Sequence, residues 1–160
     1  METEFAAQTG ANAPGTIRLR GHHFLCLLTY KGLGYTPAFV KNLSRIAQAI
    51  NDGTPVMLAQ GPDDICNGLS LEDRLRCGHD CEKESVYRRD AQAIAATAPL
   101  LDLNMNAPFI LTANAVKTLR AAFASGQTRA GCVGCPWVQT CDNIAADGFA
   151  GTILLPADTE

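Results

Sequence analysis

The 160-residue sequence has no apolar run close to the roughly 20 residues that a helix needs to cross a bilayer. Its first residues, Met1 to Glu4, are acidic and lack the charged and then apolar pattern of a secretion signal. A net charge of −3 provides no basic field for nucleic acid. We therefore expect a cytoplasmic protein that binds neither membranes nor nucleic acid.

Familiar catalytic patterns are absent as well. The sequence holds no phosphate-cradling glycine loop, no zinc-protease helix and no motif that pairs a nucleophile with a base. It has no internal repeat and no linker long enough to separate two domains. Hydrophobic residues make up 47% of the chain and charged residues 18%, which is typical of a globular protein. We expect residues 1–15 to form a flexible leader and residues 16–156 a single globular, cysteine-rich domain.

Hydrophobic periodicity predicts an α+β fold that is mostly helical, with a small sheet of three or four short strands. Two threonines stand where helix N-caps are expected, Thr36 before Pro37 and Thr112 before another apolar stripe. Pro99 is expected to end the alanine-rich helix that precedes it. The helices are expected at residues 22–30, 36–50, 82–98, 112–126 and 142–146, and the strands at 17–20, 55–59, 109–111 and 152–155.

Seven cysteines are the most informative feature of the composition. The cytosol keeps thiols reduced and the count is odd, so a framework of disulfides is not expected. Clustered thiols in such a compartment are more often metal ligands or redox centres, although cysteines also serve as small core hydrophobes. Three of them, Cys132, Cys135 and Cys141, follow a C-x2-C-x5-C pattern. Gly131 and Gly134 suit the tight turn that aims two sulfurs at one point.

Three soft ligands in one loop need a fourth from elsewhere to close a metal or cluster site. Cys66 and Cys81 are the candidates, because they stand at the edges of an aperiodic stretch that is typical of a ligand-bearing loop. Cys81 also precedes a predicted helix, whose dipole would lower the pKa of its thiol. With either remote cysteine as the fourth ligand, the predicted metal-binding residues are Cys66, Cys81, Cys132, Cys135 and Cys141.

An iron–sulfur cluster is favoured over zinc at this site. Structural zinc sites usually pair two short knuckles, and Cys77-x3-Cys81 is a poor second knuckle. Three thiolates in one loop with one remote ligand are common for iron–sulfur clusters, and Pro136 follows Cys135 as a proline does in ferredoxin loops. Zinc is the alternative. A dithiol redox pair in the same C-x2-C turn, with Arg129 lowering a thiol pKa, is also open.

A second constellation, His22, His23 and Cys26, lies near the start of the chain. Adjacent helical side chains point about 100° apart, so both histidines cannot easily bind one metal. We expect one histidine to be buried or capping and the other exposed. Cys26 falls in an apolar helix and is expected to be a core thiol. With Arg18 and Arg20 nearby, this corner could instead form a pocket for an anion or a substrate.

Four segments carry a specific combination of motifs: Leu19-Arg-Gly-His-His-Phe-Leu-Cys26, Lys31-Gly-Leu-Gly-Tyr35, Gly61-Pro-Asp-Asp-Ile-Cys66, and Cys132-Val-Gly-Cys-Pro-Trp137 with Cys141. Together they resemble the bacterial and archaeal domain of unknown function 1284, over roughly residues 16–155. That family has no established activity, and its members have been suggested to bind an iron–sulfur cluster. The positions that the resemblance marks are His22, His23, Cys26, Cys66, Cys81, Cys132, Cys135 and Cys141, whereas Cys77 is peculiar to this sequence.

The leading hypothesis is a cytoplasmic iron–sulfur cluster-binding protein, for electron transfer or redox sensing with an unknown redox or protein partner. One alternative is a zinc-binding structural or interaction module. The other is a thiol-dependent enzyme that uses the His22-His23-Cys26 corner.

Overall fold

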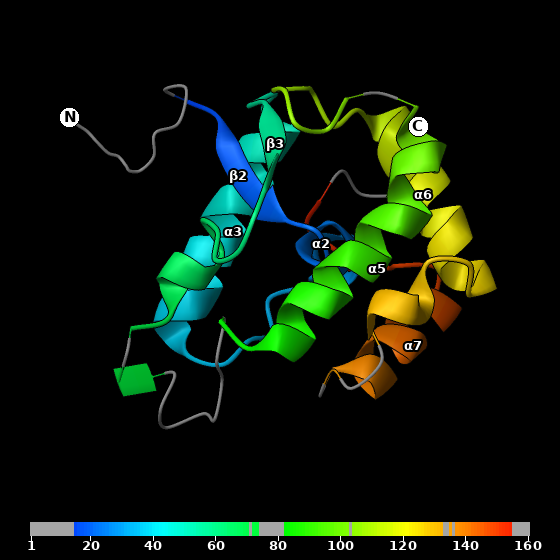
Figure 1. Ribbon diagram of the computed structural model, residues 1–160. Coiled ribbons are helices and arrows are strands. Elements are labelled where there is room, and N and C mark those ends of the chain that lie inside the picture. The colour runs from blue at the N-terminus through cyan, green and yellow to red at the C-terminus, as the bar shows by residue number, and fades with distance from the viewer. Residues whose placement is uncertain are drawn as a thin grey trace.

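The computed structural model describes residues 15–70, 72–73, 82–102, 104–132, 135 and 137–154. In chain order the elements are β2 (Ile17–Arg20), α2 (His23–Thr29), α3 (Pro37–Asn51), β3 (Val56–Ala59), the 3-10 turn η1 (Cys66–Gly68), α5 (Glu84–Leu101), α6 (Ala113–Ser125), the 3-10 turn η2 (Arg129–Cys132) and α7 (Val138–Ala146). Figure 1 shows α2 near the centre, with the two strands and α3 on one side and α5, α6 and α7 on the other.

The sheet within the described residues consists of two parallel strands, β2 and β3, with Ile17 beside Val56. The helical majority is confirmed, and a third or fourth strand is not. Phe109 makes only an isolated antiparallel bridge to Val56. The segment expected to close the sheet bonds elsewhere, because the Ile153 N–H donates to the Tyr30 carbonyl at 3.1 Å. Its backbone is therefore satisfied without a strand partner.

Both predicted helix N-caps are confirmed. The Thr36 hydroxyl oxygen accepts the N–H of Phe39 at 3.0 Å, and the Thr112 hydroxyl oxygen accepts that of Ala115 at 3.1 Å. Each bond satisfies one of the N–H groups that the first helical turn leaves unpaired. Helix α6 ends at Gly126, whose φ of 91° is a left-handed conformation that glycine adopts without strain.

The expectation that Pro99 ends its helix is wrong. Helix α5 continues to Leu101 and ends at Asp102, which has a left-handed φ of 52°. Proline breaks a helix interior by removing one N–H and crowding the carbonyl one turn earlier. Pro99 lies in the last turn of α5, and the N–H of Asp102 still bonds the Ala98 carbonyl at 3.0 Å. The helix therefore closes normally around it.

Helix α2 is the centre of the hydrophobic core. Its residues Phe24, Leu25, Leu27 and Leu28 are each at most 1% exposed. A seven-residue helix is too short to be stable alone, so this packing holds it in place. Burial of each such side chain contributes about 1.5–3 kcal/mol. In the described part of the chain, none of the helices has the length and apolarity needed to cross a bilayer.

Gly21 sets the approach of α5 to the start of α2. A Cβ at this position would stand 2.3 Å from the carbonyl oxygen of Asp90, a backbone atom of α5 that cannot turn aside. We expect Gly21→Ala to lower the free energy of unfolding by about 3 kcal/mol, measured by urea denaturation. Gly34→Ala is the control, because its Cβ would meet the ring of Phe39, a side chain that can shift. A loss near 1 kcal/mol is expected there. Equal losses would show that the Asp90 contact is not the cause.

Candidate functional site

Five thiols from separate parts of the chain line one cavity of about 110 Å³. Cys26 comes from α2 and Cys141 from α7. Cys66 begins η1, Cys132 ends η2, and Cys135 lies between η2 and α7. All five carry reduced thiols. The fold thus gathers side chains that span most of the sequence around a single space.

Four of these five cysteines were predicted as metal ligands from the sequence. The fifth predicted ligand, Cys81, lies outside the described residues, as does Cys77. Cys26 was expected to be a core thiol, and that expectation is corrected: its side chain is partly exposed and lines the cavity. Burial raises the pKa of the Cys26 thiol well above its usual value, and charge on Cys135 and Cys141 raises it further. Cys26 therefore lies close enough to these thiols for their charge to affect its ionisation.

Local hydrogen bonds shape the loop that carries the last three cysteines. The N–H of Cys135 donates to the Cys132 carbonyl at 3.0 Å, which closes the C-x2-C turn. The N–H of Trp137 lies 3.4 Å from the Cys135 sulfur and is positioned to donate to it. The Thr29 hydroxyl lies 3.2 Å from the Cys141 sulfur. Burial raises the pKa of the Cys141 thiol, and the contact with Thr29 acts in the opposite direction.

The distances between possible ligand atoms indicate where a single metal ion could bind with little side-chain movement. Among the described residues, only His23, Asp63 and Cys66 bring three possible ligand atoms within 4.8 Å of one another. No three of the sulfurs of Cys26, Cys132, Cys135 and Cys141 therefore come that close together. Two thiolates on one tetrahedral zinc ion would stand about 3.8 Å apart, given zinc–sulfur bonds of about 2.3 Å. Three of these four sulfurs would have to move closer together to bind a single zinc ion.

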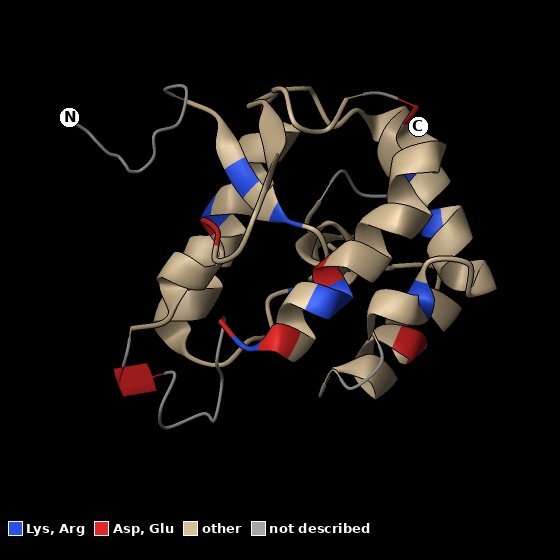
Figure 2. Cartoon of the chain, in the orientation of Figure 1, with Lys and Arg blue, Asp and Glu red and all other residues tan. Residues whose placement is uncertain are grey.

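Cationic side chains accompany the thiols. Lys31, Arg89 and Arg129 line the cavity, and none of the described acidic residues does. The Nε of Arg89 donates to the Gly131 carbonyl at 2.8 Å, and Arg129 forms an ion pair with Asp142 at 2.7 Å. Although burial opposes it, hydrogen bonds to Cys132 and Asp142 raise the pKa of Arg129. Figure 2 shows acidic and basic residues along α5 and a basic residue in η2, whereas α2 has neither kind.

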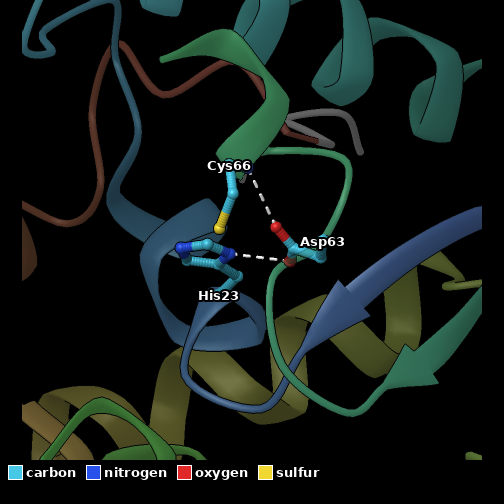
Figure 3. Close-up of side chains that lie close together, drawn as sticks. All are labelled: His23, Asp63 and Cys66. Atoms are coloured by element: carbon cyan, nitrogen blue, oxygen red, sulfur yellow. Dashed lines mark hydrogen bonds and ion pairs between the residues drawn. The ribbon is translucent and has the colours of Figure 1, made fainter. Parts of the chain in front are cut away.

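A second group of side chains lies at the start of α2. Figure 3 shows His23, Asp63 and Cys66 converging, with the sulfur beside the imidazole ring. The Nδ1 of His23 lies 2.7 Å from Asp63 Oδ2. Burial opposes ionisation of Asp63, but the charge and hydrogen bond of His23 outweigh it and lower the pKa of Asp63 to about 2. Asp63 also shapes the turn before η1, because its Oδ1 accepts the N–H groups of Ile65 and Cys66.

The two histidines do not divide into one buried and one exposed residue. His22 is buried, and the side chain of His23 is only 12% exposed. The Nδ1 of His22 lies 2.7 Å from an oxygen of Asp90, and the two imidazole rings are 4.4 Å apart. Burial and the neighbouring His23 lower the pKa of His22 to about 4. The expectation of an exposed histidine is wrong, because the carboxylates of Asp63 and Asp90 hold both rings against the core.

Arg20 is the residue of this region whose position the sequence did not predict. It is 1% exposed, and its Nε pairs with Asp90 at 2.8 Å across the start of α2. Its Nη1 lies 3.8 Å from the sulfur of Cys66. The partners are 70 and 46 residues away in the sequence. No local pattern signals such pairs.

A family model matches the chain. The model, described as a protein of unknown function (DUF1284), matches residues 34–141, which is more than half of the chain. No curated protein and no solved structure matches. The chain belongs to the DUF1284 family of proteins of unknown function.

Proposed function

We propose that the protein binds an iron–sulfur cluster and serves in electron transfer or redox sensing. Cys132, Cys135 and Cys141 are the loop ligands in this proposal, and Cys26 is the fourth. The observation that carries it is the gathering of these four thiols, from α2, η2, α7 and the loop between η2 and α7, around one cavity. A cluster supplies one-electron exchange when it is bound.

Cys26 is preferred to the two remote cysteines predicted from the sequence. The pKa of its thiol is raised by burial first and then by charge on Cys135, Cys141 and Cys132, so it shares their surroundings. Cys66 is instead positioned beside Arg20 and His23. That Cys66 or Cys81 is a cluster ligand stays a prediction from the sequence. The experiment below tests Cys66 directly.

The surroundings of the loop suit a thiolate-bound group. Arg89 and Arg129 bring positive charge to the cavity, which offsets the negative charge that several thiolates would gather. Donors at Thr29 and Trp137 lie within hydrogen-bonding distance of two of the sulfurs. Hydrogen bonds to ligand sulfurs tune the reduction potential of iron–sulfur centres. The ring of Trp137, 5.7 Å from that of Tyr35, helps to exclude water from this end of the cavity.

The fourth ligand can be tested by comparing Cys26→Ser with Cys66→Ser. Both proteins are purified without oxygen, and their iron, acid-labile sulfide and visible absorption are measured. Cys26→Ser is expected to lose most of its iron, because a serine oxygen is a harder ligand than a thiolate. Cys66→Ser is expected to keep its iron and its brown colour. The reverse pattern would assign the fourth position to Cys66, and retention of iron by both would exclude both.

A further inference from the structure

A second candidate metal site is separate from the four proposed cluster ligands. One nitrogen of His23, one carboxylate oxygen of Asp63 and the sulfur of Cys66 lie within 4.8 Å of one another (Figure 3). His23 comes from the first turn of α2, and the other two residues belong to η1 and the turn before it. Imidazole, carboxylate and thiolate are the side-chain groups that bind zinc in proteins. The fold therefore brings all three kinds of zinc ligand together from two parts of the chain.

Burial distinguishes this group from the polar clusters that are common on protein surfaces. Asp63 is 2% exposed, Cys66 is 3% exposed, and the side chain of His23 is 12% exposed. A buried dication needs anionic ligands that offset the loss of its hydration. The carboxylate of Asp63 and a thiolate at Cys66 carry two negative charges, which equal the charge of one Zn²⁺ ion. The charges of the ligands and the metal therefore balance when zinc is bound.

The hydrogen bonds of Asp63 leave one position of its carboxylate for a metal ion. A carboxylate accepts at about four lone-pair positions. Backbone N–H groups take three of them: Arg20 bonds Oδ2 at 2.7 Å, and Ile65 and Cys66 bond Oδ1 at 3.0 and 3.1 Å. The fourth position faces Nδ1 of His23 at 2.7 Å. A metal ion can take the place of the proton between this nitrogen and Oδ2, and the three backbone bonds then orient the ligand carboxylate.

The metal belongs at the Nδ1 edge of the His23 ring. A sulfur on the lone pair of Nε2, at the far side of the ring, could not also lie within 4.8 Å of an Asp63 oxygen. In a tetrahedral zinc site, nitrogen and oxygen ligands stand about 3.4 Å apart, and sulfur stands about 3.6 Å from either. Binding therefore requires the His23–Asp63 pair to open by about 0.7 Å and the Cys66 sulfur to approach by at most about 1.2 Å. Both movements are shorter than a carbon–carbon bond of about 1.5 Å, so small side-chain rotations are sufficient.

Arg20 supports the sulfur of this site from outside the ligand set. Its Nη1 lies 3.8 Å from the Cys66 sulfur, and its Nε pairs with Asp90 at 2.8 Å. Contacts of this kind orient metal ligands, and their loss typically weakens metal binding about 10–100-fold. The carboxylate of Asp90 offsets the positive charge of Arg20, which would otherwise repel a cation nearby.

We propose that His23, Asp63 and Cys66 bind one Zn²⁺ ion, with a fourth coordination position open toward the cavity. His23 and Cys66 both line the cavity, so a small molecule that enters it can reach a metal ion between them. Three protein ligands with one exchangeable position are the usual arrangement of a catalytic zinc site. Lys31 and Arg89 also line the cavity, so a small anion is the class of ligand that suits the fourth position. The site includes none of the four proposed cluster ligands, so it stands or fails independently of the cluster.

X-ray absorption at the zinc edge tests the ligand set. The full-length protein is purified without oxygen, its zinc content is brought to one equivalent, and iron and sulfide are measured in the same sample. The expected spectrum contains one sulfur at about 2.3 Å and otherwise nitrogen and oxygen ligands at about 2.0–2.2 Å. Two or more sulfurs would place the zinc among the loop cysteines, and a spectrum without sulfur would exclude Cys66. Either result would overturn the proposal, whereas the iron and sulfide content decides the cluster separately.

The same spectrum tests the open fourth position. Mercaptoacetate is a small anion that carries a thiol, and it is added to the zinc-loaded protein. Its sulfur is expected to enter the fourth position, so that the zinc has two sulfur ligands instead of one. A sulfur count that stays at one would overturn the open position.

Zinc affinities of variants assign the individual ligands. Dissociation constants are measured by competition with a coloured chelator, and circular dichroism verifies that each variant is folded. Cys66→Ser and His23→Gln are each expected to weaken zinc binding more than about 100-fold, beyond the range for loss of a supporting contact. His22→Gln, the matched control on the neighbouring ring, and Cys135→Ser are expected to leave the affinity unchanged. Equal losses for the two histidine variants, or a loss in Cys135→Ser alone, would overturn the proposal. If Cys66→Ser does not fold, the wild-type spectrum still decides whether one sulfur binds the zinc.

Discussion

Asp63→Asn is expected to lower the free energy of unfolding by about 3–5 kcal/mol, the range seen when one partner of a buried ion pair is removed. The carboxylate is 2% exposed and joins three segments, since it accepts hydrogen bonds from β2, from His23 and from the turn before η1. An asparagine amide can accept only some of these hydrogen bonds. Its NH2 group would face N–H groups that now donate to the carboxylate. Urea denaturation measures the loss.

Asp64→Asn is the matched control for this prediction. The neighbouring carboxylate accepts a hydrogen bond from the backbone N–H of Arg18 at 2.9 Å, at a partly buried position. An asparagine oxygen can accept the same bond, so the expected loss is only about 1 kcal/mol. Similar losses for the two variants would contradict the organising role given to Asp63.

The pH dependence of stability provides a second check on Asp63. Its pKa in the folded protein is about 2, below the ordinary value of 3.8. A lowered pKa in the folded state stabilises the protein above the unfolded value, and the contribution is lost as the pH falls through the folded value. The stability difference between the wild type and Asp63→Asn should therefore be full above pH 4 and shrink between pH 4 and pH 2. A difference that stays constant over this window would mean that the charge of Asp63 is not what stabilises the fold.

Cys135→Ser is expected to lose the proposed iron–sulfur cluster and to lower the melting temperature by about 5–10 °C. Ligation stabilises only the folded state, and a ligand at 100 times its dissociation constant contributes about 2.7 kcal/mol. For a chain of this size, each kcal/mol corresponds to about 2–4 °C. Absorption spectra and thermal melts of protein purified without oxygen measure both effects.

Cys77→Ser is the comparison for Cys135→Ser. Cys77 lies outside the described residues, and the sequence interpretation gives it no part in the site. The expected result is unchanged metal content and a melting temperature close to that of the wild type. Equal effects of the two substitutions would show that the ligands have been assigned to the wrong residues.

The parts of the fold that follow from neighbouring residues could be predicted from the sequence. Thr36 and Thr112 cap helices because a hydroxyl reaches an N–H three residues later. The turn between Cys132 and Cys135 depends on a spacing visible in the sequence. Such features involve few residues and little tertiary context, so the pattern is sufficient to locate them.

The parts that depend on distant residues could not be predicted. From its local sequence, Asp90 would be expected to be a solvent-exposed helix residue. Its carboxylate instead accepts hydrogen bonds from Arg20 and His22, which are 70 and 68 residues away in the sequence. The segment expected to form a closing strand binds Arg120 instead. The guanidinium of Arg120 donates to the Leu154 carbonyl at 2.6 Å and to Thr152 Oγ1 at 3.0 Å. Neither contact leaves a periodic signal, since each depends on how α5 and α6 pack against the remainder of the chain.

The measurement that tests the central claim most directly is the metal and sulfide content of the protein purified without oxygen. The arrangement of Cys26, Cys132, Cys135 and Cys141 predicts iron together with acid-labile sulfide, and loss of both when Cys135 is replaced by serine. A colourless protein that holds one zinc ion per chain and no sulfide would contradict it.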